Sequence, residues 1–221
     1  MFAAIFALLA AFTLPVLADS YFLSGPKPEK KWMEYFYRAN GSAPAPKPST
    51  LLNNGTAVGF TFTTTPDVSG FQTKHPSFNQ VLLGDLSGKT VSANVEVSAS
   101  GPFTYYGEGT PANPCGTPAS VRLYFETTNN DLGYSQYWWS NPGSALLASG
   151  SAVITASMNP AEWSDWDGHS GTYDADHTAA FAAAAADVQL IGLSFGGGCF
   201  FANGVGNPSG ASFALTNFTV N

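Results

Sequence analysis

Hydrophobic and polar residues alternate along most of the chain beyond residue 55. The clearest run is Thr90–Val97, where valine or alanine fills every second position and Ser92, Asn94 and Glu96 lie between them. Successive side chains of a strand point to opposite faces, so this pattern predicts a half-buried strand. Similar runs predict further strands at Val58–Thr65, Ser120–Thr127, Ala152–Met158, Val188–Phe195 and Ala211–Val220. Clusters of Gly, Asn, Pro and Ser separate nearly all of them, as expected for turns.

A helical pattern is confined to Asp176–Asp187, where Thr178 or Asp176 is the expected N-cap of an Ala-rich turn. One short helix among about eight or nine strands predicts an all-β fold, a jelly-roll-like antiparallel β-sandwich. The last strand changes phase between Leu215 and Phe218, which predicts a bulge near Thr216.

The chain divides into three expected segments. Residues 1–18 carry no charge and form an apolar stretch ending in small residues, which is typical of a signal peptide cleaved after Ala18. We therefore expect a secreted, extracellular protein. Residues 19–54 are expected to form a Pro-rich N-terminal arm, in which Trp32, Tyr35 and Phe36 dock against the domain or a partner. Residues 55–221 then form the sandwich, and no later run is long enough for a membrane span.

The chain has two cysteines, Cys115 and Cys199. In an oxidising compartment we expect them to form one disulfide, which closes a long loop and contributes roughly 4 kcal/mol in the chain-entropy model. The alternative is two separate buried thiols. Three sequons at Asn40, Asn54 and Asn217 are glycosylation sites if the source is eukaryotic, which predicts a glycoprotein.

Composition excludes some classes of function. Of the 221 residues, 44% are hydrophobic and 10% charged, which fits one globular domain. Eight Lys and Arg stand against fifteen Asp and Glu, for a net charge of -7. This balance leaves no surplus of cations to neutralise phosphates, so we expect no nucleic-acid partner.

The densest polar cluster is Glu162–His177, which holds five carboxylates and two histidines. Four readings remain open for it. Calcium could be held through Asp165, Asp167, Asp174 and Asp176, although their spacing does not match an EF-hand. His169 and His177 with aspartates could bind a transition metal. A glycosidase would need two carboxylates about 5 to 10 Å apart, either both from this loop folded back on itself or one of them from Glu126 or Glu108 on another strand. The simplest reading is a solvated acidic loop before the helix.

Two sequence motifs resemble catalytic motifs but lack the partner residues or the spacing that those motifs require. Gly192–Gly196 matches G-x-S-x-G, but no Asp, Glu or His lies beyond Asp187 to complete a triad, so Ser194 is interpreted as a strand residue. Gly84–Thr90 has three residues between its glycines where a phosphate loop has four, and we interpret it as a turn.

Aromatic residues gather near the acidic cluster. Trp138 and Trp139 are adjacent, so they must point to opposite faces of a strand and cannot both fill one side of the core. Exposed aromatic rings stack on the apolar faces of sugars, while carboxylates bind the hydroxyls. The candidate binding residues are Tyr137, Trp138, Trp139, Trp163, Trp166, Asp165 and Asp167.

Three stretches carry a resemblance to a known family: Leu82–Val97, Val121–Phe125 followed by Tyr137–Trp139, and Ser212–Val220. Their pattern is similar to the strands of galactose-binding-like jelly rolls, the scaffold of many carbohydrate-binding modules. The resemblance implies a non-catalytic, lectin-like domain that binds a polysaccharide or cell-surface glycan, often with a structural calcium as its only cofactor.

Three functions follow as hypotheses. The first is a secreted carbohydrate-binding protein that performs no chemistry. The second is a secreted carbohydrate-active hydrolase using paired carboxylates from the acidic cluster and Glu126. The third is an extracellular structural or interaction protein whose contact segment is the N-terminal arm.

Overall fold

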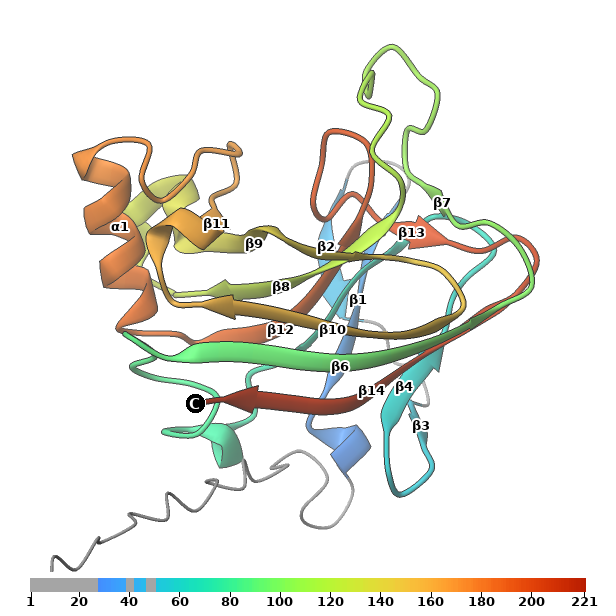
Figure 1. Cartoon of the computed structure of the whole chain (residues 1–221), viewed down its shortest axis with the longest axis horizontal. Helices are drawn as coiled ribbons and strands as arrows, with labels where there is room; N and C mark the ends of the chain where they lie inside the picture. Colours follow the sequence, from blue (N-terminus) through green and yellow to red (C-terminus); the bar gives the residue numbers. More distant parts are fainter. Residues whose placement is uncertain (1–27, 39–41, 47–50) are drawn as a thin grey trace, which may run out of the picture.

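Two antiparallel sheets pack face to face around an apolar core (Figure 1). The computed structural model of the chain describes residues 28–38, 42–46 and 51–221. The expected signal peptide at 1–18 and the sequon at Asn40 lie outside the described residues. Among the residues it describes, no helix is both long and apolar enough to span a membrane.

The larger sheet has the strand order β11-β9-β8-β12-β5-β1-β2, and β13 joins β5 to β7 at its side. Its strands are β1 Met33–Arg38, β2 Ser42–Pro46, β5 Val68–Thr73, β7 Thr104–Tyr105, β8 Ser120–Glu126, β9 Tyr137–Leu146, β11 Trp163–Ser164, β12 Leu190–Gly196 and β13 Val205–Gly206.

The smaller sheet has the order β10-β6-β14-β4-β3. Its strands are β3 Leu52–Asn53, β4 Val58–Thr61, β6 Thr90–Ala99, β10 Gly150–Ser157 and β14 Ala211–Val220. The helix α1 spans Ala175–Ala185, and short 3-10 turns occur at η1 Pro28–Lys30, η2 Pro76–Phe78, η3 Asn130–Gln136 and η4 Pro160–Glu162. In Figure 1, α1 lies at one end of the sandwich, beyond the ends of β8 and β12.

All six strands predicted from alternation are present, as β4, β6, β8, β10, β12 and β14. The all-β sandwich with one short α-helix is therefore confirmed. The described residues form 14 strand segments rather than eight or nine. Four of the additional segments span only two residues, which is too short to show a period in the sequence. The predicted bulge is also confirmed, because the pairing of β14 with β6 shifts register between Leu215 and Asn217.

The sandwich begins before residue 55, so the expected arm at 19–54 is partly wrong. β1 pairs with β5 inside the larger sheet, and the Trp32 ring stacks on Phe71 at 5.3 Å within the core. Trp32, which directly precedes β1, therefore docks on its own domain. β2 is the edge strand and contains Pro44 and Pro46, which an edge tolerates because it needs hydrogen bonds on one side only.

Aromatic rings fill the space between the sheets. Phe60 of β4 stacks on Phe213 of β14 at 5.2 Å, and Phe195 of β12 meets both rings edge-on. The Trp163 ring lies 4.9 Å from Phe125, and Phe125 in turn meets Phe181 of α1 edge-on at 5.9 Å. These edge-to-face and offset contacts add to the free energy gained by burying the rings.

The helix starts one residue earlier than the sequence predicts, and neither expected N-cap is correct. Asp174 is the N-cap, and its carboxylate accepts a hydrogen bond from the backbone N–H of His177. Thr178 instead donates through its hydroxyl to the carbonyls of Gly171 and Asp174. Asp174, Asp176 and Thr178 all have side chains that can cap a helix, so the sequence alone does not show which of them does.

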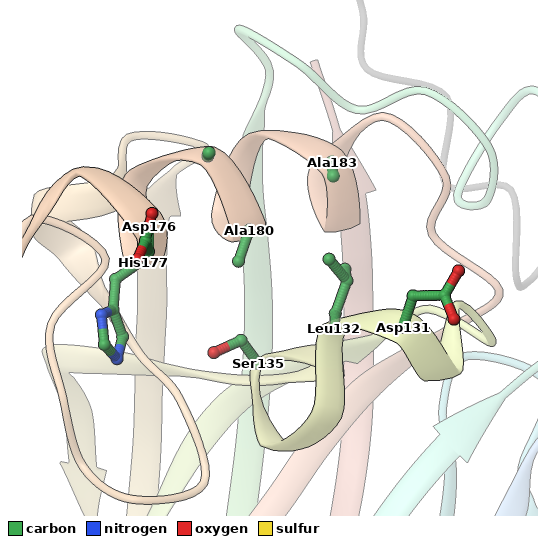
Figure 2. Close-up of a pocket in the computed structure, with 8 residues that line it drawn as sticks. Asp131, Leu132, Ser135, Asp176, His177, Ala180 and Ala183 are labelled. Atoms are coloured by element: carbon green, nitrogen blue, oxygen red, sulfur yellow. The ribbon is translucent and has the colours of Figure 1, made fainter.

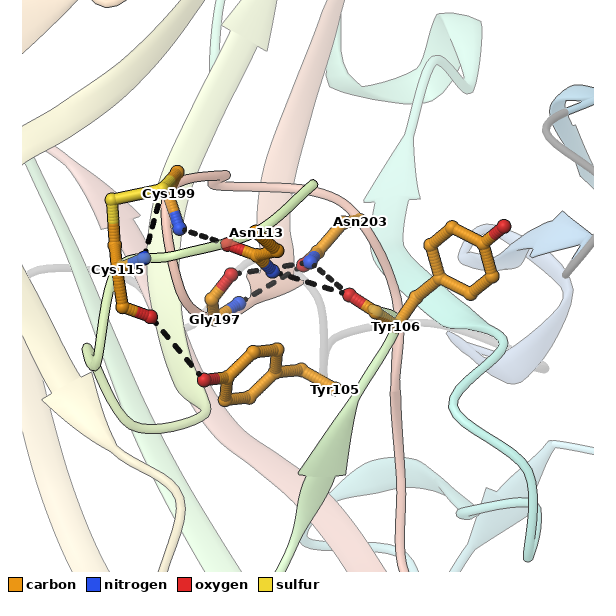
Figure 3. Close-up of a disulfide and its surroundings, with 7 residues drawn as sticks. All are labelled: Tyr105, Tyr106, Asn113, Cys115, Gly197, Cys199 and Asn203. Carbon is orange, nitrogen blue, oxygen red and sulfur yellow. Dashed lines mark hydrogen bonds between the residues drawn. A yellow bond between two sulfur atoms is a disulfide. The ribbon is translucent and has the colours of Figure 1, made fainter. Parts of the chain in front are cut away.

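The disulfide between Cys115 and Cys199 is present, as predicted (Figure 3). It joins the loop after β7 to the loop after β12, and side-chain amides join the same two loops. Asn113 Oδ1 accepts from Cys199 N at 2.8 Å, and Asn203 Nδ2 donates to Tyr106 O at 2.8 Å. Gly197 is required here, because a Cβ at this position would lie 2.3 Å from the Tyr105 ring.

Candidate functional site

The outer face of the larger sheet, on the side away from the core, carries a second aromatic cluster. In β8, Leu123 and Phe125 point into the core while Tyr124 points outward. In β9, Trp138 points inward and Trp139 outward, as their adjacency predicted. The register aligns these outward residues across neighbouring strands. An aromatic cluster outside the core is uncommon enough to suggest a binding surface.

The rings of this outer cluster are in mutual contact. Trp139 lies 5.0 Å from Tyr124, 5.8 Å from Trp166, 6.2 Å from Phe201 and 6.5 Å from Tyr137. Tyr35 of β1 packs against the same group. We call this set the aromatic face; its members are Tyr35, Tyr124, Tyr137, Trp139, Trp166 and Phe201. Tyr124 and Trp139 are buried beneath the others, whereas Trp166 is 47% exposed.

Hydrogen bonds hold the aromatic face in place. Trp139 Nε1 donates to Ser194 Oγ at 2.9 Å, and that hydroxyl donates to the Phe201 carbonyl at 2.8 Å. Ser194 is thus a strand residue that fastens the loop after β12, and not a nucleophile. The Arg122 guanidinium lies 4.5 Å from the centre of the Phe201 ring and donates to Ser140 O at 2.8 Å. The backbone carbonyl and the ring of Phe201 are therefore both held against the sheet.

Glu126 is the carboxylate of the aromatic face. Burial raises its pKa, while a hydrogen bond from the Tyr124 hydroxyl at 2.5 Å and the charge of Lys74 act in the opposite direction. Burial and the nearby Glu126 raise the pKa of Tyr35 to about 12 and also raise the pKa of Tyr137. The phenols therefore stay protonated at neutral pH and can donate hydrogen bonds to a ligand.

The structure brings together three of the seven predicted binding residues. Tyr137, Trp139 and Trp166 belong to the aromatic face. Trp138 and Trp163 do not, and their prediction as stacking residues is wrong, because both rings are fully buried in the core. The indole N–H of Trp163 donates to Ser157 O at 2.7 Å, which satisfies its one polar group inside the protein.

The two predicted aspartates have different surroundings. Asp165 is 2% exposed, and its Oδ1 accepts the backbone N–H groups of Asp167 and His169. It therefore shapes its own loop rather than facing the aromatic face. Asp167 is exposed. Asp174 caps α1 and Asp176 is exposed in its first turn, so the four proposed calcium ligands do not form one set of converging carboxylates in the described structure.

The two described sequons also differ. Asn54 is exposed in a turn, where its side-chain oxygen accepts from Thr56 and Ala57 backbone N–H groups. Asn217 lies at the bulge in β14, half-buried, with its side-chain oxygen buried and without a hydrogen bond among the described residues. Of these two, Asn54 is the more accessible to a glycosylating enzyme.

Sequence reasoning did not assign Tyr35, Tyr124, Phe201 or Arg122 to a site. A signal was present in β8, because Arg122, Tyr124 and Glu126 alternate with the core residues and must share the opposite face. Tyr35 and Phe201 gave no such signal. They reach this face only through the pairing of β1 with β5 and the fold of the loop after β12.

Comparison with known proteins adds little to this geometry. No family model and no curated protein matches the chain. Similar solved structures include one described as "xylan-binding module CBM15", which is 13% identical and aligns with a TM-score of 0.39 over 85% of this chain and 92% of the other. This degree of likeness does not assign the chain to a family.

The raised pKa of Glu126 leads to a prediction about stability. Between its ordinary pKa of 4.5 and the raised value, the native state binds more protons than the unfolded state, so the free energy of unfolding falls as pH rises through this window. Replacing Glu126 with glutamine removes the titrating carboxyl group, and with it this fall in the free energy of unfolding. Urea unfolding from about pH 4.5 to about pH 8 should show the variant gaining stability relative to the unaltered chain as pH rises.

The matched control is Glu108→Gln, which changes an exposed carboxylate. It should leave the pH dependence of unfolding unaltered. A Glu126→Gln curve parallel to that of the unaltered chain would contradict a raised pKa of Glu126 in the native state.

Proposed function

We propose that this chain is a secreted, non-catalytic protein that binds a polysaccharide or cell-surface glycan through the aromatic face. The observation that carries the proposal is the placement of Trp166, Tyr137 and Tyr35, partly exposed, over a buried layer of Trp139 and Tyr124 on the side of the sheet away from the core. Core packing does not account for rings in this position.

The chemistry of this face suits sugars. The apolar faces of pyranose rings stack on indole and phenol rings, and protonated phenols donate hydrogen bonds to sugar hydroxyls. Glu126 supplies an acceptor for the same hydroxyls. A net charge of -7 disfavours strongly anionic polymers, so we expect a neutral glycan.

Secretion rests on two further observations. The apolar segment at 1–18 has the features of a signal peptide, and the disulfide is of a kind that persists in oxidising compartments. Both support an extracellular location, where polysaccharide ligands are found.

Binding should be measured by titrating the full chain, expressed in a disulfide-competent secretory host, with a panel of neutral polysaccharides. We expect saturable quenching of tryptophan fluorescence, and Trp166→Ala or Tyr137→Ala should weaken affinity by about tenfold to hundredfold, because each removes an exposed stacking ring. Tyr106→Ala is the matched control, since Tyr106 is an exposed aromatic beside the disulfide and outside the aromatic face.

Two results would count against the proposal: no binding across the panel, or binding that survives both substitutions on the aromatic face. Pull-down of insoluble polysaccharides provides an independent readout, and addition of calcium tests the expectation of a structural ion.

One observation favours a hydrolase as the second candidate. The raised pKa of Glu126 is a property of general acids in glycosidases. Such an enzyme also requires a second carboxylate about 5–10 Å away. Reducing ends should be assayed in the binding reactions: their release, abolished in Glu126→Gln, would replace the binding function by hydrolysis.

A further inference from the structure

The loop between β11 and α1 folds back on itself around Asp165. Asp165 N donates to His169 O at 2.9 Å, and His169 N donates to Asp165 Oδ1 at 3.0 Å. Gly171 N donates to Trp163 O, and a bridge pairs Ser164 with Ser170. These bonds hold His169 beside the buried carboxylate of Asp165.

His177 reaches the same carboxylate from the first turn of α1. Its Nδ1 lies 2.6 Å from Asp174 Oδ1, and its Nε2 lies 3.6 Å from Asp165 Oδ2. Metal-binding histidines are commonly oriented in this way, with one ring nitrogen hydrogen-bonded to a carboxylate and the other left for the ion. The His169 and His177 rings meet edge-on at 5.0 Å.

We propose that Asp165, His169 and His177 form a binding site for a divalent transition metal ion of the zinc class. One ligand atom from each of the three residues lies within 4.8 Å of the other two. A tetrahedral ion with bonds of about 2.0–2.1 Å places its ligand atoms roughly 3.3 Å apart. The three side chains therefore need to move only slightly to bind one ion together.

The donor set selects the class of metal. Two imidazole nitrogens and one carboxylate suit zinc, copper or nickel, whereas calcium takes six to eight oxygen ligands. Asp165 Oδ2 accepts one hydrogen bond, from Ser135 Oγ at 3.0 Å, which leaves the carboxylate a further lone pair for an ion.

An open groove reaches the site at His177. It lies between α1 and η3 and has a volume of about 490 Å³. Figure 2 shows His177 and Ser135 facing each other at one end of the groove, with Leu132 and Asp131 farther along η3. Ser135 also contacts Asp165, so an ion can enter beside His177 without opening the core.

The test is calorimetric titration of the full chain with zinc chloride alone. The protein is purified without a polyhistidine tag and freed of metal by a chelator, and no glycan is present. We expect one zinc ion per chain. His169→Ala and His177→Ala should each weaken binding at least tenfold, because each removes one of three protein ligands.

Two matched variants sharpen the result. His75→Ala removes the third histidine of the chain, which is exposed and distant in sequence from the loop, and should leave zinc affinity unchanged. Asp174→Asn keeps a capping side chain at the start of α1 but removes the charge that orients His177, and should weaken binding about tenfold.

Cobalt provides a readout on the unaltered chain, independent of whether variants fold. Bound Co²⁺ should show the intense visible absorption of a four-coordinate site. The spectrum of the hydrated ion, absence of zinc binding, binding of calcium in preference to zinc, or zinc affinity retained in both histidine variants would each overturn the proposal. None of these results depends on glycan binding.

Discussion

Replacing Cys115 and Cys199 together with serine is expected to lower the free energy of unfolding by about 4 kcal/mol. The two residues are 84 positions apart, so the disulfide removes much of the conformational freedom of the unfolded chain. This loss is a large part of the 5–15 kcal/mol by which domains are usually stable. Urea unfolding at neutral pH measures it.

The native loops should change little in this variant. Asn113 and Asn203 still join them by hydrogen bonds, so the effect arises mainly in the unfolded state. A steeper dependence of stability on urea should accompany the loss, since an uncrosslinked chain exposes more surface when it unfolds. A destabilisation below about 1 kcal/mol would contradict the chain-entropy account.

The second large effect concerns tryptophans only three positions apart. Trp163→Ala should cost about 3–5 kcal/mol, because it leaves a cavity beside Phe125 and removes a fully buried ring. Trp166→Ala should change stability by about 0.5 kcal/mol or less, because its ring is 47% exposed. Urea unfolding of both variants gives the comparison.

The same two variants distinguish an effect on stability from an effect on glycan binding. Trp166→Ala should remain folded and lose glycan affinity, whereas the folded fraction of Trp163→Ala should bind normally. Equal destabilisation by the two substitutions would mean that Trp166 is packed as core, and would remove the aromatic face as a candidate site.

Local pattern predicted those parts of the fold that depend on near neighbours in sequence. The alternation in β6 fixed which residues face the core, and the phase change in β14 located its bulge. The adjacency of Trp138 and Trp139 required them to lie on opposite faces. In each case the physical constraint acts within a few residues, so the sequence displays it directly.

The site could not be predicted in the same way. Tyr35 packs against the cluster that contains Tyr124 and Trp139 although β5 and β12 lie between β1 and β8. Its place there depends on the register of those strand pairings, which is set by the packing of the whole sandwich. The strand β1 was missed for a related reason. Its short aromatic run lies in Pro-rich surroundings, which favour an extended chain but do not show that a sheet will accept it.

The position of β14 has a consequence for the order of folding during synthesis. It follows every other described strand in sequence, yet lies between β6 and β4 in the smaller sheet. Until residues 211–220 have left the ribosome, β4 has no partner on that side, and Phe60 lacks the Phe213 ring that covers it. The smaller sheet therefore closes late, and the apolar side chains that β14 covers stay exposed to aggregation until this last strand is inserted.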